Sequence, residues 1–212
     1  MVPSSRVMEM TEIQAKKVSS FYISRGMIPE KDREIYDYCF EVLISTASTT
    51  AVILGISIAA GTVLRTLIYM AVFGMLKSSV GGYHARTHTG CLVRTVGTYA
   101  VYLALSLLLP AGVMRMLTVL LTGFAAAAVF RLAPVGTANK PLGEAQTIRL
   151  RRQSRILIGI LAAVNLILLA AGADPQYAFA MSSGMTIVAG SLIIGWKQMK
   201  ETESSGNEGA NN

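Results

Sequence analysis

Histidine and cysteine, two residue types that can carry out covalent catalysis, come together in one short segment of this chain. Residues 81–91 read Gly-Gly-Tyr-His-Ala-Arg-Thr-His-Thr-Gly-Cys and include both histidines, His84 and His88, and one of the two cysteines, Cys91. A thiol beside an imidazole is a nucleophile beside a base. Because a free cysteine has a pKa of about 8.5, an imidazole or a cation must favour its reactive thiolate at neutral pH. Three cations lie nearby in the sequence: Lys77, Arg86 and Arg94. The segment predicts a cysteine enzyme, although an isolated cysteine would more often be a buried packing residue.

Either histidine could act as the base. On an unbroken helix His84 and Cys91 would lie about 10 Å apart along the axis, at about 1.5 Å per residue. Direct proton transfer needs about 3 Å, so the segment must fold back or contain a break. Glycines make such a break easy, and the segment has three of them, Gly81, Gly82 and Gly90. His88 is three residues from Cys91 and would be its neighbour on a helix, so geometry leaves both histidines as candidates.

The same residues allow a metal site as an alternative. His84 and His88 have the four-residue spacing of helical zinc ligands, and Cys91 could be a third ligand. The glutamate that follows the first histidine in zinc proteases is replaced here by Ala85. We therefore expect no metal and no other cofactor.

The composition predicts an integral membrane protein with an all-α fold. Of 212 residues, 52% are hydrophobic and only 15% are charged, against about 25% charged residues in typical soluble domains. The apolar residues form long runs, which favours membrane helices over a soluble protein with buried core helices. We predict six transmembrane helices at 42–60, 63–80, 92–109, 113–131, 156–172 and 177–196.

The flanking segments complete the predicted organisation, a single membrane domain over residues 1–200. Residues 1–41 are expected to form cytoplasmic or interfacial helices, and residues 42–196 the six-helix membrane bundle. The apolar pattern from Met8 to Phe21 suits a helix on the membrane surface or one packed on the rest of the chain. Pro29 followed by acidic residues indicates a helix start. The polar residues 201–212 predict a disordered tail.

Basic residues predict the orientation in the membrane. The net charge is +7, and all 19 lysines and arginines except Arg65 and Arg115 fall on the side of the two termini if there are six spans. This asymmetry places both termini, the 81–91 segment and the 131–155 loop in the cytoplasm. It also explains the charge better than a nucleic-acid partner, which we do not expect. We expect no secretory signal and two free cytoplasmic thiols, at Cys39 and Cys91.

Two sequence blocks resemble the AgrB family of membrane endopeptidases, which process precursors of cyclic quorum-sensing peptides. The first is Gly-Gly-Tyr-His-Ala at 81–85 with a cysteine seven residues after the histidine. The second is Ala133-Pro134 followed by Asn-Lys-Pro-Leu at 139–142 and a basic run to Arg155. The resemblance extends over residues 10–198 in the number of spans, their spacing and the placement of charge.

The resemblance implies that Cys91 is the nucleophile and His84 the general base and acid, with Gly82 shaping the loop. Lys77 falls where relatives commonly have arginine, but lysine cannot make the planar bidentate contact of a guanidinium with a carboxylate. Lys77 could equally anchor the end of a span. Gly81, Arg86 and His88 are further candidates for supporting the site or binding substrate. No acidic residue clearly orients His84, and the candidates are Glu34, Asp37, Glu41 and Glu144.

The implied function is cleavage of an AgrD-like precursor peptide at a bacterial plasma membrane, with the active site on the cytoplasmic side. An acyl-enzyme thioester would then be converted into a cyclic thiolactone or lactone. Membrane lipid is an expected partner, and faces of small residues permit a homodimer without requiring one. A transporter or channel, or a non-catalytic scaffold, is the alternative, and neither would need the Cys–His pair.

Overall fold

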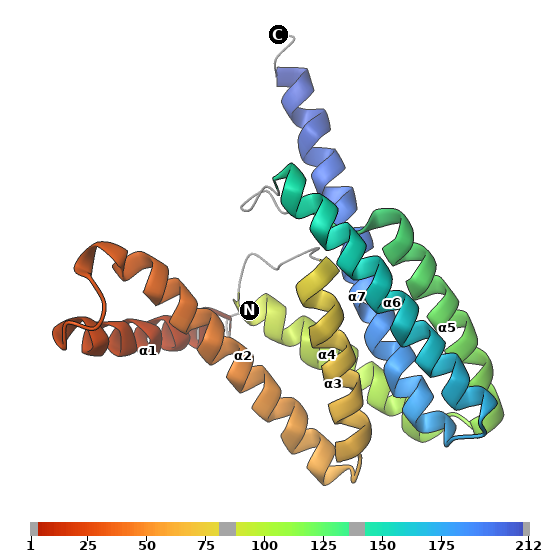
Figure 1. Ribbon diagram of the computed structural model, residues 1–212. Helices are drawn as coiled ribbons and strands as arrows, with labels where there is room; N and C mark the ends of the chain where they lie inside the picture. Colours follow the sequence, from red (N-terminus) through yellow and green to blue (C-terminus); the bar gives the residue numbers. More distant parts are fainter. Residues whose placement is uncertain (1–3, 81–87, 136–142, 210–212) are drawn as a thin grey trace. The chain divides into compact units, whose positions relative to one another are not determined.

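The computed structural model describes residues 4–80, 88–135 and 143–209, which form helices joined by short connections (Figure 1). In chain order these are α1 (Ser4–Ser24), the 3₁₀ helix η1 (Glu30–Asp32), α2 (Arg33–Ala59), α3 (Val63–Val80), α4 (His88–Leu108), α5 (Ala111–Leu132), α6 (Glu144–Ala170) and α7 (Pro175–Gly209). The described part of the chain contains no strand, which confirms the all-α prediction. Pro29 directly precedes η1, which leads into α2, so a helix begins where the sequence predicted one.

Five stretches of helix in the described residues are long and apolar enough to cross a membrane: Glu30–Ala59, Val63–Val80, Ala111–Leu132, Ala145–Ala170 and Pro175–Lys200. The remaining predicted span, 92–109, coincides with Leu92–Leu108, which is apolar but shorter. Each of the six predicted ranges therefore falls on a helix. The count of six spans, the cytoplasmic termini and the disordered tail at 201–212 remain predictions.

The chain divides into two compact units. The first contains residues 1–61 and 85–100, and the second contains residues 62–84 and 101–212. Helix α4 contributes to both, with its N-terminal part in the first unit and its C-terminal part in the second.

In the first unit, α1 packs on α2 as a helical hairpin (Figure 1). Ala15 and Ser19, one turn apart on α1, are buried, and the Ser19 hydroxyl donates a hydrogen bond to the Asp37 carboxylate of α2. The Tyr22 ring stacks on the Phe40 ring with centroids 5.7 Å apart. The structure shows this N-terminal segment as a helix packed on α2, and a position on the membrane surface remains a prediction. Lys16, on the exposed side of α1, donates a hydrogen bond to Glu12, and this bond raises the pKa of the lysine above its ordinary value.

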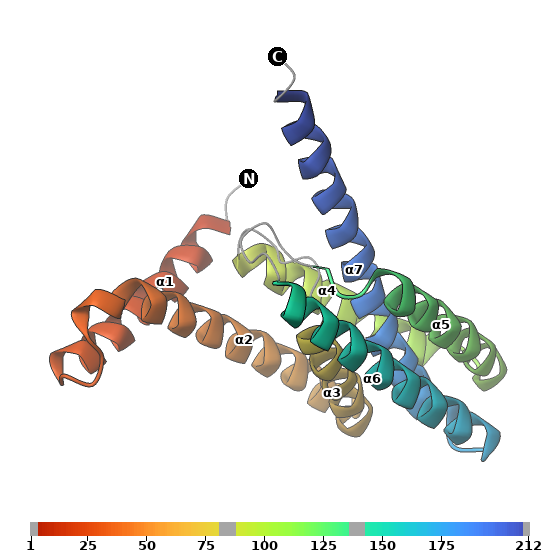
Figure 2. The same ribbon diagram turned by 45° about the horizontal axis from the view of Figure 1, so that its top comes forward.

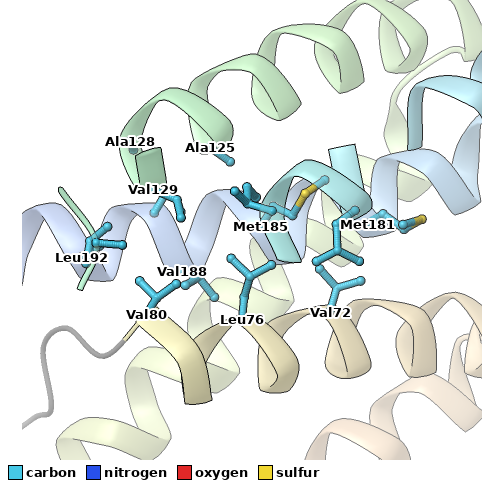
Figure 3. Close-up of a cluster of buried hydrophobic side chains, with 14 of the residues drawn as sticks. Val72, Leu76, Val80, Ala125, Ala128, Val129, Met181, Met185, Val188 and Leu192 are labelled. Carbon is cyan, nitrogen blue, oxygen red and sulfur yellow. The ribbon is translucent and has the colours of Figure 1, made fainter. Parts of the chain in front are cut away.

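In the second unit, α7 is the central helix and packs against α3, α5 and α6. Two thirds of its membrane-spanning window (67%) is buried, against 28% or less for the other candidate spans. Figure 3 shows α3 and α5 sending small and branched side chains toward α7 from different sides. The residues labelled there are Val72, Leu76 and Val80 of α3, Ala125, Ala128 and Val129 of α5, and Met181, Met185, Val188 and Leu192 of α7.

Close approach between α3 and α7 depends on Gly184. A Cβ atom at this position would lie only 2.9 Å from the Tyr69 carbonyl oxygen of α3, so glycine alone fits without a shift of the backbone. Small residues at such contacts are typical of membrane helices, which lack a hydrophobic driving force for association within lipid. Beside this contact the rings of Tyr69 and Tyr102 stack with centroids 4.9 Å apart.

Polar side chains also join the helices of the second unit. The Asn165 amide of α6 donates a 2.9 Å hydrogen bond to the Thr122 hydroxyl of α5, and both residues are buried. The Asn165 Oδ1 atom is buried and accepts no hydrogen bond from the described residues. In both views α7 continues past the ends of α5 and α6 (Figures 1 and 2).

Candidate active site

The described part of the site begins with Lys77, in the last turn of α3. Its ammonium group donates a 3.1 Å hydrogen bond to the Ser191 hydroxyl of α7. Ser191 in turn donates its own hydroxyl hydrogen to the Val188 carbonyl, at 2.8 Å. Because the serine hydrogen is used within α7, the oxygen lone pairs face the cation. Lys77 is therefore held by α7 as well as by α3, a contact that its sequence neighbours do not reveal.

The end of α3 is tied to the second sequence block. The Val135 amide donates a 3.2 Å hydrogen bond to the Val80 carbonyl, the last residue of α3. Val80, Ala133 and Val135 are all buried. Ala133 and Val135, on either side of Pro134, thus pack at the end of α3 beside Val80, the residue that precedes the first sequence block in the chain.

Four of the predicted site residues, Gly81, Gly82, His84 and Arg86, lie outside the described residues. For His88 and Cys91 the structure gives the backbone alone: His88 is the first residue of α4, and Cys91 is the fourth. Cys91 therefore lies in the first turn of α4. The positive end of a helix dipole favours an anion, and thiols at helix N-termini have a lowered pKa in general.

The acidic candidates for orienting the base divide by their surroundings. Asp37 accepts the Ser19 hydrogen bond within the α1–α2 hairpin, so its carboxylate already has a partner. Glu34 is exposed and Glu41 half-buried on the same helix, and the Glu144 side chain lies outside the described residues. Among the side chains that the structure describes, no three His, Cys, Asp or Glu groups could hold a metal ion.

The second cysteine differs from Cys91 in its position. Cys39 is a free, exposed thiol in the N-terminal half of α2, as the sequence analysis expected. Cys39 is more than one turn from either end of α2, so the positive end of the helix dipole does not favour its thiolate. Cys39 is therefore a natural internal reference for the reactivity of Cys91.

Comparison with known proteins assigns the chain to a family. The family model described as AgrB, accessory gene regulator B, matches residues 15–196, which include both sequence blocks, Lys77 and Ser191. No curated protein and no solved structure matches the chain significantly. The match confirms the resemblance seen in the sequence and, together with the long apolar helices, indicates a multi-pass membrane protein. The chain therefore belongs to the accessory gene regulator B family, whose members take part in processing quorum-sensing peptides.

Proposed function

We propose that this protein is a membrane-embedded cysteine endopeptidase that cleaves a quorum-sensing peptide precursor and promotes its cyclisation. The observation that carries the proposal is the family match over residues 15–196, with the Cys–His segment inside it and Cys91 in the N-terminal part of α4. A transporter or a scaffold would have no use for a thiol and an imidazole at this position. The substrate class is an AgrD-like peptide, and the site faces the bacterial cytoplasm.

In the first step, the Cys91 thiolate attacks the carbonyl carbon of a peptide bond on the C-terminal side of the future ring. His84 takes the thiol proton and then gives it to the leaving amine as the carbon–nitrogen bond breaks. The products are an acyl-enzyme thioester and a free C-terminal fragment. A helix N-terminus at Cys91 stabilises the thiolate before attack and makes this step feasible at neutral pH.

In the second step, a cysteine or serine side chain of the precursor attacks the thioester carbonyl. His84 takes the hydrogen of the attacking thiol or hydroxyl, the new carbon–sulfur or carbon–oxygen bond closes the ring, and Cys91 leaves as a thiolate. Exchange of one thioester for another changes the free energy little, whereas hydrolysis is strongly downhill. The site must therefore keep water from the acyl-enzyme, which a position at the membrane boundary favours.

Lys77 supplies a fixed positive charge close to the reacting segment in the sequence. We assign it the binding of a carboxylate in the acidic C-terminal part of the precursor. The hydrogen bond to Ser191 supports this role because it restricts the flexible lysine side chain to one direction. Such restriction reduces the entropy that a lysine loses when it binds a carboxylate.

The test is precursor processing by the purified full-length chain in proteoliposomes, followed by mass spectrometry. Cys91→Ala should abolish both cleavage and ring formation, and Cys39→Ala should leave both unchanged. His84→Ala should lose nearly all activity, while His88→Ala should retain most of it. Retained activity in His84→Ala together with loss in His88→Ala would reverse the assignment of the base. Full processing by Cys91→Ala would sink the proposal.

A further inference from the structure

The outward face of α6 carries arginines at one end and an apolar stripe along the rest of its length. Ser154, Ile158, Leu161 and Asn165 are buried, and at about 100° per residue they share one side of the helix. Arg149, Arg152, Ile156, Ile160 and Ile167 fall on the opposite side by the same spacing. All five are exposed, and the three isoleucines keep 52%, 55% and 65% of their surface.

A shallow groove of about 520 Å³ lies at the arginine end of this face. Its lining is Ala145, Ile148, Arg149, Arg152, Gln153 and Ile156. An adjoining groove adds Arg151 and Arg155 to the same surface. No acidic residue occurs in the sequence between Glu144 and Asp174, so nothing along this part of α6 neutralises the four guanidinium groups.

We infer the level of the membrane boundary from Arg155, which lies beside the end of the apolar helix α5. Arg155 donates a 3.1 Å hydrogen bond to the Phe130 carbonyl in the last turn of α5, where that apolar helix ends. With a rise of about 1.5 Å per residue, Arg152 and Arg149 lie about 6 Å and 10 Å beyond Ile156 along α6. The headgroup layer of a bilayer is about 5–8 Å thick on each side of the hydrocarbon core. The guanidinium groups are thus within reach of lipid phosphates, and the isoleucine stripe faces the acyl chains.

We propose that this face of α6 is a binding site for one anionic phospholipid. Arg149 and Arg152 bind the phosphate and the negatively charged headgroup, and an acyl chain lies along Ile156, Ile160 and Ile167. An acidic peptide would use the arginines alone, since the stripe continues to the depth of the hydrocarbon. A free phosphate would likewise have no use for the apolar part. The combination of the two parts on one helix face is what assigns the site to a lipid.

The experiment is a titration of the detergent-purified full-length protein with phosphatidylglycerol, followed by native mass spectrometry. Phosphatidylcholine with the same acyl chains is the comparison lipid. At about 1 kcal/mol for each basic residue near a membrane surface, Arg149→Gln with Arg152→Gln should weaken phosphatidylglycerol binding about 25-fold. The matched control is Lys197→Gln with Lys200→Gln, which removes the same charge from the exposed end of α7 and should change the affinity less than twofold.

A second pair of variants separates charge from geometry. Arg149→Lys with Arg152→Lys keeps both charges but loses the planar fork that binds a phosphate with two parallel hydrogen bonds. It should bind with intermediate affinity, and thermal unfolding of all variants in the same detergent controls for folding. Equal weakening by the α6 and α7 double variants would overturn the site in favour of a diffuse electrostatic effect. Displacement of the lipid by an equal concentration of glycerophosphate or of an acidic peptide would overturn the assignment to a lipid.

Discussion

Gly184 is the position at which the packing of α3 on α7 can be tested most directly. A methyl group there would lie 2.9 Å from the Tyr69 carbonyl oxygen and 3.4 Å from Val72 Cβ and Cγ1. The first contact involves backbone, which cannot rotate away as a side chain can. Gly184→Ala should therefore separate the two helices by several tenths of an ångström and cost about 1–3 kcal/mol, the usual penalty for overpacking a core.

The matched control lies on the same helix. A methyl group at Gly190 would have no heavy atom within 4 Å, so Gly190→Ala should be neutral or stabilise α7 by up to about 1 kcal/mol through its higher helix propensity. Reversible unfolding in mixed micelles, with the two variants measured side by side, gives the difference in unfolding free energy. Equal stabilities for Gly184→Ala and Gly190→Ala would refute the claim that close packing of α3 and α7 requires glycine.

Gly184→Ala should also weaken the hydrogen bond between Lys77 and Ser191 in the candidate active site. Ser191 lies seven residues after Gly184, about 10 Å further along α7. Because Lys77 and Ser191 join the same two helices, separation at Gly184 lengthens their 3.1 Å hydrogen bond. Precursor cleavage by Gly184→Ala should fall at temperatures where the protein is still folded, and cleavage by Gly190→Ala should not.

Three further substitutions test separate contacts. Asn165→Leu removes the hydrogen bond to Thr122, worth about 0.6 kcal/mol in a membrane, but it also removes a buried acceptor that has no partner among the described residues. The free energy of unfolding should therefore stay the same or rise. A clear fall in this free energy would contradict the reasoning. Ser191→Ala removes the hydroxyl that accepts the Lys77 hydrogen bond and should raise the KM of the precursor more than it lowers kcat. Ser191→Thr keeps a hydroxyl and should restore wild-type kinetics; an equal effect of both variants would argue against positioning. Val135→Pro removes the donor to the buried Val80 carbonyl and should reduce stability by about 1–3 kcal/mol more than Val135→Ala, which loses buried side-chain volume but keeps the amide.

Hydropathy located the apolar part of each helix but not the full helix. The predicted range 63–80 coincides with α3, because there the apolar run and the helix end together. Helix α6 begins at Glu144, twelve residues before the predicted span at 156–172. The intervening Glu, Ala, Gln and Arg residues are good helix formers but polar, so they extend the helix without adding to the apolar signal. The arginine groove arises in this extension and was not predicted.

The local spacing of residues in the sequence predicted the nucleophile and the base, but it did not predict the long-range contacts around the site. His84 and Cys91 stand close in sequence, so residue type alone suggested a nucleophile and a base, which remains a prediction. The contact between Lys77 and Ser191 joins residues 114 positions apart, and Val80 is 55 positions from Val135. Such contacts depend on how α3, α5 and α7 pack, and no pattern within one segment contains that information.

The central place of α7 has a consequence for the order in which the protein matures. Helices of a membrane protein insert individually and associate afterwards. Here the helix with the most buried surface, α7, is made after α3 and α5, so these two helices enter the membrane before the partner that packs between them. A chain interrupted before residue 175 would contain Cys91 but would lack Ser191, the α7 residue that accepts the hydrogen bond of Lys77. We therefore expect the proposed peptide processing to begin only after α7 has joined α3 and α5, and chains that lack α7 to be inactive in the precursor assay.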